Sequence, residues 1–378
     1  MRFEVLVTFP PHHLDGEDFR FGWSLLADAL PGRWHVGRNE ALPDLVQRVA
    51  PIVDARTELC VLVPDPAIIV PAGCLGVLTD ALVSNAAPAV VAASPGHFPS
   101  DAPPDYLTLH GLERYAQRCL HLSPRPWTGT QPQLVVIQRA LLESLFGADG
   151  AWQLPAGTLL VPGAPVHPYG DYHRSPRSEV LALLPKKVSR LLDMGGGEGL
   201  FAAEAKRLKQ CEACVVEANA AAAEIASRHV DRVWQGDLLE TIFDGQFDCV
   251  TALDVIEHCA DTDAVLGKIR GLLAPDGTFI ASIPNLGHWS VIADLLAGRW
   301  DYLPVGIACR SHLRFFTRRN IEEFWRRAGF RIAAVRPITI AAPSSFAAAL
   351  EPAAAICSVA LDRDSLDAYQ FLVAARSR

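Results

Sequence analysis

An apolar segment that stops at a run of glycines is the feature of this sequence that most constrains its fold. Residues 191–201 read Leu-Leu-Asp-Met-Gly-Gly-Gly-Glu-Gly-Leu-Phe, with alternate glycines at Gly195, Gly197 and Gly199. An apolar run that ends in glycines and continues as a helix is typical of a strand, a tight turn and a helix that together hold a cofactor. Glycine permits a positive φ in such a turn and lets the backbone approach a bulky ligand closely. We therefore predict a cofactor-binding turn here, with a purely structural glycine loop as the alternative.

The spacing and the charges of this turn narrow the choice of cofactor. The dinucleotide fingerprint G-x-G-x-x-G requires a glycine at position 200, where the sequence has Leu200. Asp193 and Glu198 lie beside the glycines and predict an acidic mouth, which repels a pyrophosphate but accepts a cationic sulfonium. The segment has apolar residues, then an acid, then G-x-G-x-G. This order resembles motif I of the class I S-adenosylmethionine (SAM)-dependent methyltransferases. The resemblance implies SAM as the cofactor.

Downstream of residue 178, apolar runs alternate with amphipathic helical stretches, as in a parallel sheet covered by helices. We expect helices at residues 178–184, 201–209, 220–228, 263–273 and 319–328. We expect strands at residues 188–194, 213–217, 232–235, 247–253, 278–283, 331–338 and 370–374. The fold class is therefore α/β. The family resemblance implies a Rossmann-like sheet of seven strands with helices on both faces and an antiparallel final strand.

A stretch rich in proline and glycine, residues 161–177, predicts a linker between two domains. The resemblance covers residues 178–378, the predicted methyltransferase domain. Residues 1–160 have strand-like runs at 3–8, 59–63 and 89–93, and we expect a second α/β domain there. Residues 59–73 faintly resemble the metal-binding turn of GT-A glycosyltransferases, but only one acid, Asp65, is present. A degenerate glycosyltransferase-like domain that binds an acceptor, or that supports the other domain, is favoured over active glycosyl transfer.

Three acids after successive strands are candidates for binding the cofactor. Glu217 ends the second strand of the predicted sheet, where a carboxylate can bind both hydroxyls of a ribose. Asp237 and Leu238 follow the third strand, and the resemblance implies that an acid at that place meets the adenine amino group. Asp254 ends the fourth strand, whose carboxyl end borders the cofactor crevice.

The segment Asp-Val-Ile-Glu-His at residues 254–258 resembles a segment of ubiquinone-type O-methyltransferases. In some of those enzymes two acids and a histidine hold a divalent ion, so the resemblance implies a possible Mg²⁺ site at Asp254, Glu257 and His258. The favoured alternative is that no metal binds and that these side chains shape the pocket. Glu257 is then a substrate-pocket residue.

Residues 306–317 resemble a segment of methyltransferases from glycan and natural-product clusters, with Cys309 where an aspartate is usual. A neutral imidazole suits removal of a proton from a hydroxyl group. His312 is the first candidate for this general base and His258 the second, while a packing role for His312 is equally favoured. Asn285, His288 and Trp289 are candidates to line the acceptor pocket.

The composition excludes several classes of function. A net charge of −8 argues against nucleic-acid binding, which needs a basic face. We expect no membrane span, because no apolar run reaches about 18 residues. Nine scattered cysteines and an N-terminus without a secretory apolar core predict a cytoplasmic protein.

The favoured function is SAM-dependent O-methylation of a sugar or small hydroxylated metabolite, with a small-molecule or glycan acceptor as partner. One alternative is a non-catalytic, glycosyltransferase-like binding protein with a SAM-sensing domain. Another is a bifunctional glycosyltransferase–methyltransferase. The sequence leaves the oligomeric state open.

Overall fold

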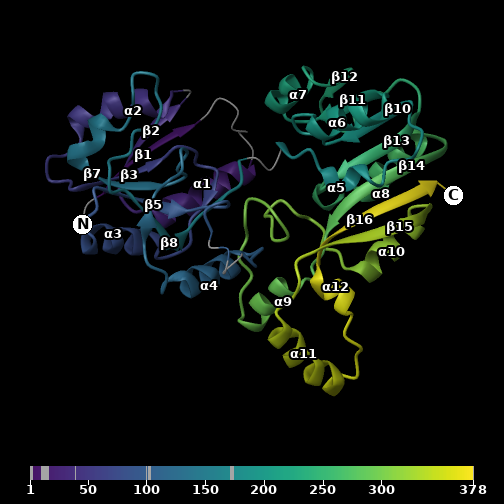
Figure 1. Cartoon of the computed structure of the whole chain (residues 1–378). Helices are drawn as coiled ribbons and strands as arrows, with labels where there is room; N and C mark the ends of the chain where they lie inside the picture. Colours follow the sequence, from purple (N-terminus) through teal and green to yellow (C-terminus); the bar gives the residue numbers. More distant parts are fainter. Residues whose placement is uncertain are drawn as a thin grey trace. The chain divides into compact units, whose positions relative to one another are not determined.

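The computed structural model describes residues 3–9, 17–38, 40–98, 100, 104–170 and 174–377 (Figure 1). The chain divides into two compact units. The first comprises Met1–Gly170 and Asp301–Val305, and the second comprises Asp171–Trp300 and Gly306–Arg378. No helix in the described part of the chain is long and apolar enough to cross a bilayer.

The second unit is built on a sheet of seven strands, which confirms the predicted architecture. The strand order is β12-β11-β10-β13-β14-β16-β15. The last strand of the chain runs antiparallel to both of its neighbours, whereas the pairs from β12 to β14 are parallel. The strands are β10 (Arg190–Met194), β11 (Glu212–Glu217), β12 (Arg232–Gln235), β13 (Phe247–Leu253), β14 (Leu273–Pro284), β15 (Phe330–Thr339) and β16 (Ala368–Ser377).

Helices cover both faces of this sheet because successive strand residues point to opposite sides. Leu192 of β10 belongs to an apolar cluster with Leu266 of α8 and Trp325 of α10. The neighbouring Leu191 belongs to the opposite cluster, with Phe201 of α6. The helices of this unit are α5 (Ser178–Leu181), α6 (Leu200–Lys209), α7 (Ala220–Ala226), the 3-10 helix η4 (Ile256–His258), α8 (Thr262–Leu272), α9 (Trp289–Leu296), α10 (Arg318–Arg327), α11 (Ser344–Ile356) and α12 (Arg363–Asp367).

The first unit has its own seven-stranded sheet, of order β2-β1-β3-β7-β5-β8-β6. Strand β7 runs antiparallel between β3 and β5. The strands are β1 (Phe3–Phe9), β2 (Arg33–Arg38), β3 (Leu59–Val63), β5 (Ala89–Ala93), β6 (Arg125–Pro126), β7 (Val135–Gln138) and β8 (Leu159–Pro165), and β4 (Ile68–Ile69) pairs separately with β9 (His167–Pro168). The helices are α1 (Glu17–Ala29), α2 (Leu42–Val49), η1 (Ala50–Ile52), α3 (Cys74–Ser84), α4 (Leu109–Cys119) and η2 (Arg139–Ser144).

The start of the predicted linker needs correction, since residues 161–165 belong to strand β8 inside the first sheet. Ala92 of β5 lies opposite Val161, whereas the next residue, Ala93, lies opposite Pro165. Three residues are therefore looped out of the ladder. Such a bulge accommodates a proline and a glycine that a regular central strand would not tolerate.

Candidate functional site

The glycine turn between β10 and α6 has the conformation that its sequence predicts. Gly195, Gly197 and Gly199 have φ values of 66°, 55° and 78°. A Cβ atom on Gly195 would lie 2.7 Å from Cγ2 of Val255, so a side chain there is excluded by both conformation and space. The prediction of a strand, a tight turn and a helix is confirmed, and the binding of a cofactor at this turn stays a prediction.

Glu217 lies at the end of β11, directly against this turn. Its Oε2 accepts a hydrogen bond from the backbone N–H of Gly197 at 2.9 Å, and its Oε1 accepts one from Asn219 at 2.8 Å. Each carboxylate oxygen has a second lone pair, so further donors such as ribose hydroxyls can bind there. Glu217 therefore lies at the glycine turn, and its binding of ribose stays a prediction.

Asp193 does not make the mouth acidic, contrary to the prediction. Its side chain is only 2 % exposed and accepts a hydrogen bond from the Thr251 hydroxyl at 2.6 Å. Burial raises the pKa of Asp193 to about 7. Glu198, the other predicted acid of the mouth, pairs with Arg174 at 3.0 Å. Asp193 thus joins β10 to β13 beneath the turn. It can affect cofactor binding only indirectly, by holding the backbone of the turn in its conformation.

The raised pKa of Asp193 predicts a pH-dependent stability. The folded protein holds this proton up to about pH 7, whereas an unfolded chain releases it near pH 4. Stability from this group is therefore fully present at low pH and is lost as the pH rises through 7. Asp193→Asn should stabilise the protein relative to wild type at pH 8 by up to about 4 kcal/mol more than at pH 4. Urea unfolding at both pH values measures this difference, and an equal difference at both would contradict it. The exposed Asp263→Asn variant is the control.

Asp237 lies after β12, where the adenine ligand is predicted. Its carboxylate accepts a hydrogen bond from the backbone N–H of Leu239 at 2.7 Å and is exposed. Leu238 is partly buried against the core of the unit. The acid therefore shapes its own turn, and its contact with adenine stays a prediction.

Asp254 is engaged more extensively than the sequence indicates. Its carboxylate accepts hydrogen bonds from Arg177 at 2.8 Å, from Ser282 at 2.7 Å and from Gln370 at 2.5 Å. Its φ of 56° is a left-handed value, which the surrounding hydrogen bonds hold in place. The predicted cofactor ligand is thus an anchor for the end of β13. Sequence reasoning missed Arg177, Ser282 and Gln370, because no local motif marks these residues.

Glu257, His258 and His312 form a cluster at the same edge of the sheet. Their ligand atoms lie within 4.8 Å of one another. Nε2 of His312 is 4.0 Å from Oε1 of Glu257, and the two imidazole rings meet edge to face at 4.7 Å. Nδ1 of His312 lies 3.2 Å from the Ile307 carbonyl oxygen, and Nδ1 of His258 lies 3.0 Å from the Ser311 hydroxyl. The sequence identified all three residues, and the fold brings them together.

Glu257 is the most unusual member of this cluster. It is fully buried, and neither carboxylate oxygen has a hydrogen-bond partner among the residues that the structure describes. Burial, followed by the nearby charge of Asp254, raises the pKa of Glu257 well above its ordinary value. A buried carboxyl group without a partner is costly. It therefore favours a positive charge or a proton donor beside it, which a protonated His312 would supply.

The predicted Mg²⁺ site is not assembled as expected. Asp254 is absent from the cluster of possible ligands, and three side chains already donate to its carboxylate. The cluster instead offers one carboxylate and two imidazoles. Mg²⁺ prefers oxygen ligands, whereas imidazoles suit divalent transition metals. These residues do not fit a magnesium ion.

The predicted acceptor-pocket residues Asn285, His288 and Trp289 are buried and structural, which corrects that assignment. Nδ2 of Asn285 donates to the carbonyl oxygens of Ser365 and Ala368. His288 caps α9, and burial lowers its pKa to about 4. Nε1 of Trp289 donates to the Ile340 carbonyl oxygen at 2.9 Å. The fold uses these polar groups to fix the exit from β14.

Comparison with known proteins agrees with this geometry. Residues 170–335 match the family described as methyltransferase domain. A ubiquinone biosynthesis O-methyltransferase of Cereibacter sphaeroides is 32 % identical over 162 residues, which cover 40 % of this chain and 64 % of the relative. The ubiquinone biosynthesis O-methyltransferase of Azorhizobium caulinodans is 29 % identical over 210 residues, which cover 50 % of this chain and 79 % of the relative.

Solved structures of SAM-dependent methyltransferases are also similar to this chain. The protein from Archaeoglobus fulgidus is 16 % identical, with a TM-score of 0.39, and covers 55 % of this chain and 97 % of its own. The protein from Mesorhizobium loti is 18 % identical, with a TM-score of 0.37. The match covers 53 % of this chain and 98 % of the Mesorhizobium protein.

Proposed function

We propose that the second unit is a SAM-dependent enzyme that methylates a hydroxyl oxygen of a small acceptor, and the match of residues 170–335 to the family described as methyltransferase domain supports this. When bound, SAM supplies an electrophilic methyl group on its sulfonium. The glycine turn gives the cofactor room, and Glu217 binds its ribose. The chain spans about 64 % of the length of the first Cereibacter relative, so the activity, the acceptor and the cytoplasmic location are all part of this proposal.

The observation that carries the proposal is the pairing of His312 with the buried Glu257. The Ile307 carbonyl, 3.2 Å from Nδ1, favours the tautomer with hydrogen on Nδ1 and the lone pair on Nε2. Nε2 takes the proton of the acceptor hydroxyl as the oxygen bonds to the methyl carbon and the carbon–sulfur bond breaks. In its ionised form, Glu257, 4.0 Å away, stabilises the imidazolium that forms. His258 is the more exposed of the two histidines, and we assign it to the side of the pocket that receives the acceptor.

Oxygen is the favoured nucleophile because a histidine with a carboxylate beside it suits deprotonation of a hydroxyl group. The names of the ubiquinone O-methyltransferase relatives support the same class of reaction. A catechol or phenol and a sugar hydroxyl both satisfy this chemistry. Most of the catalytic effect would come from holding the methyl group and the oxygen in line.

A screen of acceptors tests this function. The full chain with SAM should release S-adenosylhomocysteine in the presence of a catechol, a phenol or a sugar, and mass spectrometry should find one added methyl group on oxygen. The proposed reaction uses no metal, so we expect it to survive a chelator. Binding of SAM without turnover of any acceptor would favour the SAM-sensing alternative. Release of sugar from a nucleotide sugar would favour the bifunctional one.

A further inference from the structure

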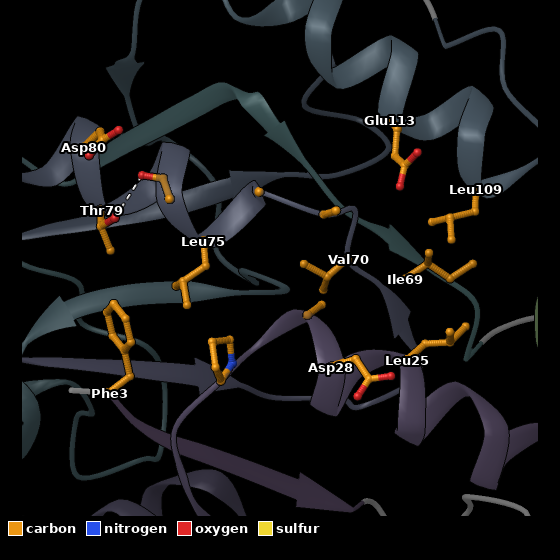
Figure 2. A pocket seen from close by; sticks show the side chains of 15 residues that line it. Phe3, Leu25, Asp28, Ile69, Val70, Leu75, Thr79, Asp80, Leu109 and Glu113 are labelled. Atoms are coloured by element: carbon orange, nitrogen blue, oxygen red, sulfur yellow. Dashed lines mark hydrogen bonds between the residues drawn. The ribbon is translucent and has the colours of Figure 1, made fainter. Parts of the chain in front are cut away.

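A groove in the first unit lies among helices α1, α3 and α4 and strand β4 (Figure 2). It encloses about 710 Å³, which is within the range of small-molecule sites. All of its lining residues belong to the first unit, and none of them belongs to the candidate site described above.

The middle of the groove is apolar. Figure 2 shows Leu75 and Val70 between its two ends, with Leu25, Ile69 and Leu109 beyond them. Gly73 and Gly76 of the α3 region also line it, and a Cβ atom built on either one would have no heavy atom within 4 Å. The floor is therefore open above these glycines and can receive aliphatic groups.

The charges in the groove are all negative and lie toward opposite ends. Asp80 lies at one end, and Asp28 and Glu113 lie at the other, on three different helices (Figure 2). The lining contains no lysine, arginine or histidine. Glu113 has a histidine of its own helix, His110, 3.7 Å away. Within the described ranges of the chain, Asp28 and Asp80 have no ion-pair partner, and the Thr79 hydroxyl donates to the Gly76 carbonyl oxygen at 2.9 Å.

We propose that this groove binds an aliphatic diamine or polyamine. The methylene chain lies over the apolar middle, where each buried CH₂ contributes about 0.8 kcal/mol. One ammonium group faces Asp80, and the other faces Asp28 and Glu113. An anion would meet three carboxylates, and a neutral chain would offer no counter-charge to Asp28 and Asp80, the two exposed acids of the groove.

Calorimetry on the full chain with octamethylenediamine as the probe tests the site. The diamine should bind about tenfold more tightly than octylamine, and the eight-carbon dicarboxylate should not bind. Asp80→Asn should lower diamine affinity to that of octylamine and leave octylamine unchanged. Gly76→Leu should abolish binding of both amines, because its side chain fills the groove. Asp44→Asn, at an exposed acid of α2, is the matched control and should change nothing.

Three outcomes would overturn the proposal. One is the absence of amine binding up to about 10 mM, the range of very weak affinity. Another is equal binding of the diamine and an uncharged eight-carbon diol. The third is an equal loss for Asp80→Asn and Asp44→Asn, which would indicate attraction to the general negative charge of the protein. These measurements involve no methyl transfer, so their failure would leave the proposed enzyme activity unaffected.

Discussion

Replacing Glu217 by alanine should weaken SAM binding by about two orders of magnitude. In the proposed complex its carboxylate binds both ribose hydroxyls, and a hydrogen bond to a charged group contributes roughly 1.5–3 kcal/mol. The loss of two such bonds predicts at least a hundredfold increase in Kd. The substitution also removes the acceptor for the Gly197 N–H, which loosens the turn. Titration calorimetry with SAM and with S-adenosylhomocysteine measures the effect.

Glu224→Ala is the matched control for this experiment. Glu224 is an exposed glutamate of α7 that pairs with Arg228 one helical turn away. Its replacement should leave both affinities within about twofold of wild type. Unchanged affinity in Glu217→Ala would remove Glu217 from the cofactor site. A loss for S-adenosylhomocysteine as large as that for SAM is expected, because the ribose is common to both.

Replacing His312 by alanine should lower kcat by about 10²–10⁴, the usual contribution of a general base. Glu257→Gln should lower kcat less, by about tenfold to a hundredfold, because the neutral amide no longer stabilises the imidazolium. In both variants the Kd for SAM should remain that of wild type. Single-turnover assays combined with calorimetry separate these two effects.

The matched control for His312→Ala is His121→Ala, at an exposed histidine of the first unit. It should leave kcat unchanged. A wild-type kcat in His312→Ala would reduce His312 to a packing residue. If Glu257→Gln lowered activity only through loss of SAM affinity, Glu257 would be supporting the cofactor turn and not the base.

Local patterns predicted the central strands of the second unit well because β10, β11 and β13 are short, largely apolar runs. The strand predicted at residues 247–253 is observed as β13 with the same bounds. The first unit was harder. Pro162 and Gly163 indicated a linker, but the register shift between β5 and β8 places them in a bulge. A sequence pattern cannot distinguish a proline in a loop from one in a bulge, since only the neighbouring strand makes the difference.

The candidate site shows the same limit at the level of side chains. The sequence brought forward Glu217, Glu257 and His312 because each lies at a strand end or in a motif with chemical meaning. The sequence predicted Asp193 at the acidic mouth of the glycine turn, because no local pattern indicates its hydrogen bond from Thr251, 58 residues away. Arg177 was missed for the same reason, because its partner Asp254 is 77 residues further along the chain. Long-range polar contacts decide such roles, and periodicity carries no information about them.

The excursion of residues 301–305 has a practical consequence for dissecting the protein. The chain leaves the second unit after Trp300, places Leu303 in a buried cluster with Ile69 and Leu112 of the first, and returns at Gly306. A single proteolytic cut after Gly170 would therefore leave the amino-terminal fragment still holding a peptide of the carboxy-terminal one. A recombinant truncation beginning at residue 171 would expose Leu303 to water just upstream of the segment that carries His312. If that truncation were inactive, the cause could be the lost anchoring of Leu303 as well as the loss of the first unit itself.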